Sequence, residues 1–300
     1  MSPDVAAALS FLAGHGRLLD RRRAELLLDR TGPDAVLAAV DGHRNDDGGY
    51  GWGIEPDLRA PESQPAGALH AFEVFAKIGP ATTPRAVELC DWLEAVSLPD
   101  GGLPFALPVA DRAACAPFWA GADPAVSTLQ STAFTAGAAL RVAAHDPVVA
   151  GHPWLDRAAR YCLDAVAALE EAPHAIALSF AVRFLDAAHD RYPQAPALLE
   201  RLGRFVPGDG RVPVAGGAEG ETMRALDFAP FPGSPASALL DAGVIEAELD
   251  ELAAGQRDDG GWAVDFGSFS PAAALEWRGY ATVGALTTLR AHGRLGASRS

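Results

Sequence analysis

The sequence predicts an all-α protein, and more specifically a single α/α toroid, a barrel in which inner and outer helices alternate. Segments of helical length are dominated by Ala, Leu, Arg and Glu, and no segment shows the sustained alternation of β-branched and polar residues that is typical of strands. Gly and Pro concentrate between these segments. An Asp-Gly-Gly motif also recurs along the chain, each time between two helical segments, which indicates a repeat architecture.

The helical segments can be placed to within a few residues. Helices are expected near 4–13, 18–29, 33–41, 62–78, 84–96, 127–144, 154–169, 173–188, 195–204, 245–255 and 271–292. We expect one domain over 1–300, in which N-terminal helices occupy about 1–30, the repeats fill 31–293, and 294–300 form a disordered tail.

The repeat is clearest near the two ends of the chain. Residues 45–50 read Asn-Asp-Asp-Gly-Gly-Tyr and residues 256–262 read Gln-Arg-Asp-Asp-Gly-Gly-Trp. A weaker copy, Pro-Asp-Gly-Gly-Leu-Pro-Phe, lies at 99–105, and degenerate copies are expected within 150–240. In each unit an outer helix ends, the Gly residues supply the positive φ angles of the turn, an aromatic residue packs under it, and an inner helix follows.

The run at 256–262 resembles the Gln/Trp repeat of squalene and hopene cyclases, whose toroid is shared by protein prenyltransferase β-subunits, and 45–50 resembles a variant of it. Residues 44–49, 55–65 and 275–279 also resemble a group of uncharacterised actinobacterial prenyltransferase-like proteins. The resemblance implies the toroid and a terpenoid-cyclase-like activity. It is far more specific for the fold than for the reaction.

The sequence departs from both enzyme classes in its site residues. Class II terpene cyclases protonate their substrate with an Asp-x-Asp-Asp motif, which is absent here, and the matching positions 128–131 read Thr-Leu-Gln-Ser. Prenyltransferase β-subunits bind zinc through Asp, Cys and His, but Cys90, Cys115 and Cys162 have no Asp-x-Cys partner. The Asp pairs at 46–47 and 258–259 fit turn capping better than magnesium binding. No metal or cofactor is therefore expected.

Composition excludes several classes of partner. A net charge of −15 and a pI near 4.9 leave no surplus of cations for nucleic acid. The only basic run, 21–23, precedes Glu25 in a helical pattern and is interpreted as a solvated helix face. The longest apolar stretches fall well short of the roughly 20 residues of a membrane span. The first residues lack the features of a secretory signal, so we expect a cytoplasmic protein, and the oligomeric state stays open.

Candidate site residues lie in the loops that enter the expected inner helices, because these loops would line one mouth of a toroid. The candidate acids are Glu276, Asp227 and Glu62. The candidate substrate-binding residues are Glu55, Asp57, Arg59, Gln64, Trp52, Trp119, Gln130, Trp262, Trp277, Arg278 and Tyr280. Each candidate could instead have a purely structural role. Residues 55–64 could form a salt-bridged loop, and Glu276 and Arg278 a buried ion pair. Asp227 could be a turn carboxylate, and the aromatic residues could pack under the turns. His70 and His174 are interpreted as packing residues.

Two functions of different kinds fit this pattern. The first is an enzyme that carries out acid–base cyclisation or isomerisation of an apolar, isoprenoid-like or polyketide-like small molecule. The second is a non-catalytic toroid that binds a small molecule or a protein. A carbohydrate-active toroid is a third hypothesis, which would need two carboxylates about 5–10 Å apart across a groove. Closure of a toroid also predicts that loop 55–64 approaches residues 276–278.

Overall fold

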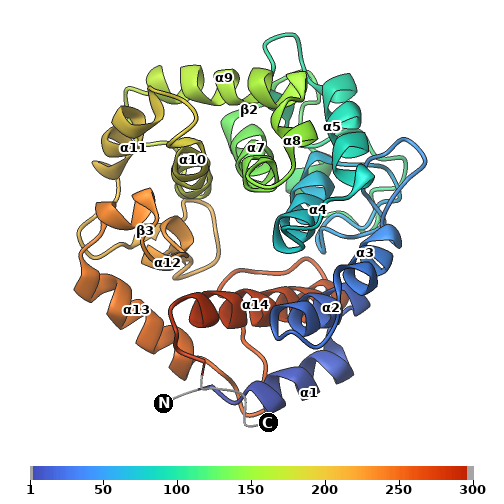
Figure 1. Cartoon of the computed structure of the whole chain (residues 1–300), viewed down its shortest axis with the longest axis vertical. Helices are drawn as coiled ribbons and strands as arrows, with labels where there is room; N and C mark the ends of the chain where they lie inside the picture. Colours follow the sequence, from blue (N-terminus) through green and yellow to red (C-terminus); the bar gives the residue numbers. More distant parts are fainter. Residues whose placement is uncertain (1–2, 296–300) are drawn as a thin grey trace. The chain divides into compact units, whose positions relative to one another are not determined.

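The computed structural model describes residues 3–295, and helices account for most of this part of the chain (Figure 1). The all-α prediction is confirmed, and every predicted helix is present with ends that differ by at most three residues. Among the described residues, strands form only two short antiparallel pairs, β1 (Leu103–Pro104) with β2 (Ser127–Thr128) and β3 (Val212–Pro213) with β4 (Thr222–Met223). Residues 296–300 of the predicted tail lie outside the described part.

The chain divides into two compact units. One unit is Val40–Phe205, and the other combines the residues before it with those after it. The boundary falls near the end of α3 (Pro33–Asp41). We call Val40–Phe205 the central unit and the remainder the terminal unit. The arrangement of the units into one toroid, and the single domain, stay predictions.

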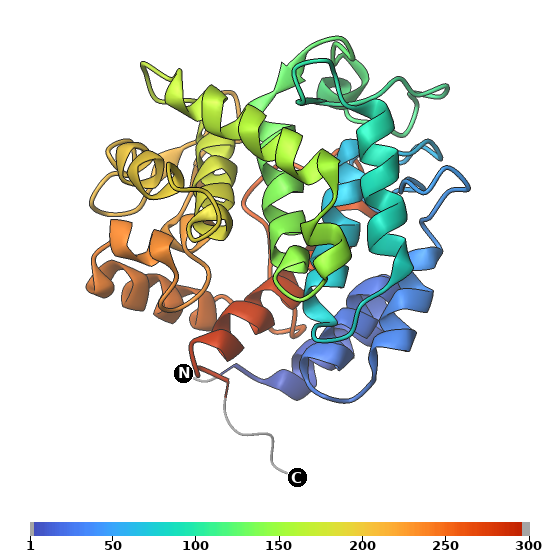
Figure 2. The ribbon, with the colours of Figure 1, turned by 45° about the horizontal axis from the view of Figure 1, so that its top comes forward.

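The central unit is built around one buried helix. Its helices are α4 (Pro65–Lys77), α5 (Pro84–Val96), α6 (Pro117–Ala120), α7 (Leu129–Ala143), α8 (Pro147–Ala150), α9 (Pro153–Ala167), α10 (Ala175–Ala188) and α11 (Ala195–Gly203). Helix α7 packs between α4 and α10 and against α9 (Figure 1; Figure 2). Small residues permit this packing, since a Cβ on Gly137 would lie only 3.2 Å from the Cα of Phe184.

The terminal unit brings the two ends of the chain together. Its elements are α1 (Val5–His15), α2 (Leu18–Leu27), α12 (Ala225–Phe228), the 3-10 helix η1 (Pro235–Leu239), α13 (Ala242–Ala254) and α14 (Pro271–Ala291). Helix α14 packs on α1, α2 and α13, around a core that includes Phe11, Leu12, Leu249, Trp262 and Leu286. A side chain at Gly279 would collide with Asp20 on α2, its Cβ falling 2.9 Å from a carboxylate oxygen. Burial of this apolar core is the main source of stability in the unit.

The three Asp-Gly-Gly turns have the same geometry. The first Gly of each turn, Gly48, Gly101 or Gly260, has a φ of +88°, +88° or +91°, which L-residues rarely adopt. Its Cα faces a backbone carbonyl of another helix: Glu88 on α5, Arg157 on α9 and Ala7 on α1. The second Gly of each turn faces a ring four residues further along that helix. The rings belong to Trp92, Tyr161 and Phe11, one for each turn.

This geometry refines the predicted role of the aromatic residue. Besides the aromatic residue within the repeat, a ring from another helix covers the turn, and it excludes any side chain at the second Gly. The Asp before the two glycines accepts a hydrogen bond from the backbone N–H of the second Gly in all three turns. The last turn docks on the first helix, so α1 and the final repeat are neighbours within the terminal unit.

A fourth, degenerate copy lies at 207–213, as expected for the region 150–240. Asp209 accepts from the backbone N–H of Arg211, and Gly210 has a positive φ of +69°. Arg211 occupies the place of the second Gly. Its guanidinium bonds to Glu248, 2.7 Å away, and to Glu251 on α13. The short helices α6, α8, α12 and η1 were not predicted. No helix within residues 3–295 has the length and apolar character needed to cross a membrane.

Candidate functional site

In the central unit, the loop that leads into α4 is joined by hydrogen bonds to the loop that contains α6 and precedes α7. Loop 52–64 and loop 103–122 share backbone hydrogen bonds, from Arg59 N–H to the Ala114 carbonyl and from Ala116 N–H to the Asp57 carbonyl. The Gln64 amide also donates to the Leu107 carbonyl and accepts from its N–H, at 3.1 and 2.8 Å. Because Gln64 is buried and fully engaged, its observed role is to join the loops.

A histidine lies beneath these loops, between two carboxylates. His70, on α4, has Nε2 3.1 Å from Glu55 Oε2 and Nδ1 3.4 Å from Glu73 Oε2. The side chains of His70, Glu55 and Glu73 are only 4%, 8% and 16% exposed. Glu55 also accepts from the backbone N–H of Asp57, at 3.3 Å. We call Glu55, His70 and Glu73 the acid–base cluster.

The cluster holds His70 in its charged form. Burial by itself lowers the pKa of His70, but the hydrogen bonds to Glu55 and Glu73 outweigh it and raise the pKa to about 9. Both ring nitrogens are then donors at neutral pH, which matches one carboxylate oxygen on each side. Each nitrogen of the imidazole thus faces a carboxylate, and Glu73 is the most exposed side chain of the three.

Two buried polar atoms in the joined loops have no hydrogen-bond partner within residues 3–295. They are Oε2 of Glu62 and the indole Nε1 of Trp119. The other carboxylate oxygen of Glu62 accepts from the Ala110 N–H at 3.0 Å, and the Trp119 ring stacks on Phe105 with 4.4 Å between centroids. Since unpaired buried polar groups are costly, an acceptor and a donor are available here for a ligand or a water molecule.

The terminal unit contains an open pocket of about 510 Å³ where the chain enters α14. Its lining includes Phe266, Phe269, Val264, Arg257 and Arg278. This volume lies within the roughly 300–1,000 Å³ of ligand pockets, and the mixture of rings and guanidinium groups suits an apolar molecule with a polar or anionic end. We call it the α14 pocket.

Several predicted site residues lie at or beside the α14 pocket. Arg278 lines it and binds both carboxylate oxygens of Asp259 at 2.8 Å, while its guanidinium lies 4.5 Å from the centroid of the Phe11 ring. Trp277 packs edge to face with Phe266, which lines the pocket, and with Tyr280. Trp262 is buried, and its indole donates to a backbone carbonyl.

The remaining candidates are more dispersed. Glu276 is half-buried on α14, and Gln130 is half-buried at the start of α7. Asp227 is exposed and accepts from the backbone N–H of Arg224 at 2.7 Å, which matches the turn-carboxylate alternative. Arg59 and Trp52 are exposed, and the Trp52 indole donates to Asn45. The predicted approach of loop 55–64 to residues 276–278 involves both units and stays a prediction.

Comparison with known proteins adds no family to this description. No protein-family model matches the sequence, and no curated protein matches it either. The acid–base cluster and the α14 pocket are therefore the features that bear on function.

Sequence reasoning named Glu55 but not the two residues that complete the cluster. His70 was interpreted as a packing residue, and Glu73 was not singled out. The signal was present, because Glu73 follows His70 by three residues on one helix face. Glu55, fifteen residues away, reaches His70 only through the fold of the loop. Among residues 3–295, no group of three His, Cys, Asp or Glu side chains has a metal-binding arrangement.

Proposed function

We propose that the protein is a cytoplasmic, terpenoid-cyclase-like enzyme that acts on an apolar, isoprenoid-like or polyketide-like small molecule by acid–base chemistry. The observation that carries the proposal is the buried Glu55–His70–Glu73 cluster. Burying three ionisable side chains is costly compared with an apolar core, and His, Glu and Asp are the side chains that most often transfer protons in enzymes.

Within this proposal the cluster favours isomerisation over cyclisation. An acid with a pKa of about 9 is too weak to protonate an unactivated alkene, the step that starts a cyclisation. The Glu73 carboxylate can instead remove a proton from a carbon next to a carbonyl and return it to another carbon of the same molecule. Between these two steps Glu73 carries the proton as a carboxylic acid and the negative charge lies on the enolate of the substrate. The positive charge of His70, next to Glu73, offsets that charge, and Glu55 keeps the imidazole oriented.

The α14 pocket supports the second candidate, a binding protein without catalysis. Its aromatic and cationic lining holds a ligand without requiring any proton transfer. Under this alternative the acid–base cluster only fastens loop 52–64 to α4. Phe269→Ala should then weaken ligand binding, while His70→Asn should affect only stability.

One experiment separates the two candidates. The protein is purified from its source, bound molecules are identified by native mass spectrometry, and each is incubated with the protein in D₂O. An enzyme of the proposed kind returns an isomer or a product that carries carbon-bound deuterium. We expect Glu73→Gln and His70→Asn to slow this exchange by about 100-fold or more, the usual contribution of a general acid–base group.

The matched control is His152→Asn. His152 is also a mostly buried histidine with a carboxylate partner, Asp91, at 3.1 Å, but Asp91 is 70% exposed. This variant should retain the exchange rate. An NMR titration should also show that His70 keeps its proton up to about pH 9. Unchanged exchange in Glu73→Gln, or a bound molecule that returns chemically unaltered, would contradict the catalytic proposal.

A further inference from the structure

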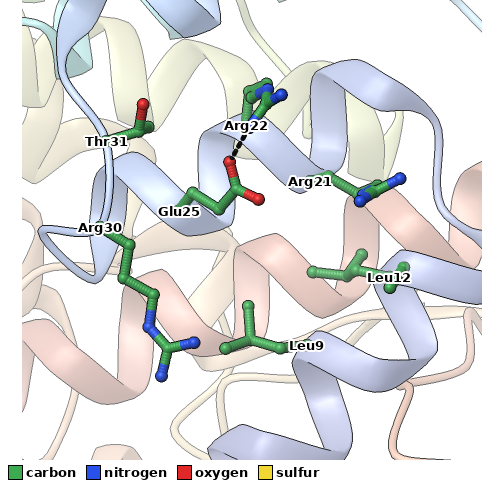
Figure 3. A pocket seen from close by; sticks show the side chains of 8 residues that line it. Leu9, Leu12, Arg21, Arg22, Glu25, Arg30 and Thr31 are labelled. Atoms are coloured by element: carbon green, nitrogen blue, oxygen red, sulfur yellow. Dashed lines mark hydrogen bonds and ion pairs between the residues drawn. The ribbon is translucent and has the colours of Figure 1, made fainter.

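A second pocket, of about 260 Å³, lies between α1 and α2 in the terminal unit. Its lining combines the apolar side chains of Leu9, Leu12 and Ala13 with three arginines, Arg21, Arg22 and Arg30, together with Glu25 and Thr31. Figure 3 shows the arginine side chains set around Leu9 and Leu12. We call it the arginine pocket. It shares no lining residue with the α14 pocket.

The basic run 21–23 does not form one uniform solvated face. Arg22 pairs with Glu25, and the guanidinium of Arg23 lies 5.1 Å from the centroid of the Tyr280 ring. Arg21 on α2 and Arg30 in the turn after α2 both line the pocket, and Figure 3 shows them on opposite sides of Leu9. The three consecutive arginines thus have three different environments.

The carboxylates nearest in sequence already have other partners. Asp20 is fully buried and pairs with Arg17 at 2.9 Å, and Asp29 pairs with Arg290 at 2.6 Å. Within residues 3–295, Arg21 and Arg30 form no ion pair. Among the described residues, the pocket therefore holds two guanidinium groups without a carboxylate partner, in a chain with 39 acidic and 24 basic residues. They leave a local excess of positive charge over an apolar floor.

We propose that the arginine pocket binds a small amphiphilic anion, a molecule with a phosphate or carboxylate head and a short apolar arm. Arg21 and Arg30 would bind the head by charge-assisted hydrogen bonds, to which the Thr31 hydroxyl adds a donor. Leu9, Leu12 and Ala13 would cover the arm. This site is independent of the proposed enzyme activity, and its ligand is of a different chemical class from an apolar substrate.

Calorimetric titration of the full chain with hexyl phosphate tests the proposal. We expect hexyl phosphate to bind more tightly than inorganic phosphate, which lacks the arm, and than hexanol, which lacks the charge. Added salt should weaken the binding, because the head is held by charge. The double variant Arg21→Gln/Arg30→Gln should bind about tenfold more weakly or worse.

Arg160→Gln is the matched control, since Arg160 is an exposed arginine of the central unit that pairs with Asp156. It should bind hexyl phosphate as the unaltered protein does. Ala13→Glu, at an exposed position of the lining, should abolish binding by placing a carboxylate in the pocket. The melting curve of the double variant shows whether it folds. If it does not, two measurements still test the proposal: Ala13→Glu should not bind hexyl phosphate, and the unaltered protein should bind hexyl phosphate more tightly than hexylamine.

Two results would overturn the proposal. One is equal affinity of the unaltered protein and the double variant for hexyl phosphate. The other is a protein that does not bind hexyl phosphate but co-sediments with phosphatidylglycerol vesicles in a manner that depends on Arg21 and Arg30. A lipid surface would then be the partner.

Discussion

The Asp-Gly-Gly turn of the terminal unit and the two of the central unit share a backbone but differ in what holds their aspartate. In the central unit, Asp47 and Asp100 each accept from a serine hydroxyl, of Ser63 at 2.8 Å and Ser127 at 2.6 Å. In the terminal unit, Asp259 is held by the guanidinium of Arg278. The aspartate of the turn is therefore held by a serine hydroxyl in the central unit and by an ion pair with arginine in the terminal unit.

The helices on which the turns dock differ as well. The central turns dock on helices that follow soon after them in the sequence, whereas the last turn docks on α1, at the opposite end of the chain. The last contact is also tighter: a Cβ on Gly260 would lie 2.2 Å from the Ala7 carbonyl oxygen, against 3.0 Å for the corresponding contacts of Gly48 and Gly101. The last turn is thus the one that joins the two termini, and its loss should be the most damaging.

The largest expected effect is at the first glycine of the last turn. Gly260→Ala adds a methyl group at a positive φ and drives it into α1, and we expect a loss of more than about 3 kcal/mol of unfolding free energy. Gly101→Ala meets the same φ but a looser contact, and should cost about 1–2 kcal/mol. Denaturant unfolding of both variants checks the order. Equal losses of unfolding free energy in the two variants would mean that the tighter contact of the last turn with α1 adds no stability.

The second largest effect is expected at Arg278, which binds the turn aspartate of the terminal unit, as a serine does in each turn of the central unit. Arg278→Ala removes two hydrogen bonds to Asp259 and a cation–π contact with Phe11, and should cost about 1–2 kcal/mol. The control is Arg290→Ala, whose pair with Asp29 is exposed on both sides and should contribute less than about 0.5 kcal/mol. Thermal melting compares them, and similar melting temperatures would refute the difference.

The ion pair should also make the last turn sensitive to acid. The Arg278 guanidinium holds the pKa of Asp259 below its usual range, so the stabilisation is present above the unfolded pKa and is lost as the pH falls through the folded one. The stability difference between the unaltered protein and Asp259→Asn should therefore shrink below about pH 4. In an Arg278→Ala background this pH dependence should largely disappear. If the pH dependence persisted in that background, a group other than Arg278 would be lowering the pKa of Asp259.

The smallest effect is expected at the serine of a central turn. Ser127→Ala removes one hydrogen bond from a hydroxyl to the Asp100 carboxylate at an exposed site and should cost about 0.5–1 kcal/mol. The cost should not vary with pH between 5 and 8, because a hydroxyl does not titrate there. Unfolding curves at several pH values test this, and a cost above that of Arg278→Ala would reverse the comparison.

The sequence by itself determined the helices and the turns. Helix ends follow from local signals such as the proline that begins α4, α5, α9 and α14, and the turns follow from glycines, which adopt a positive φ at the least cost. The order of turn, loop and helix could likewise be predicted from the sequence, because the same local pattern recurs in each repeat.

Only the tertiary structure decided which side chains meet. Glu55 reaches His70 because loop 52–64 folds back over α4, and Arg21 and Arg30 line one pocket because α1 packs against α2. The ring over each turn comes from another helix, whose register no local pattern specifies. Helix formation depends on neighbours within a few residues, whereas ion pairs, pockets and raised pKa values depend on long-range packing, and for that physical reason the fold class was predictable and the acid–base cluster was not.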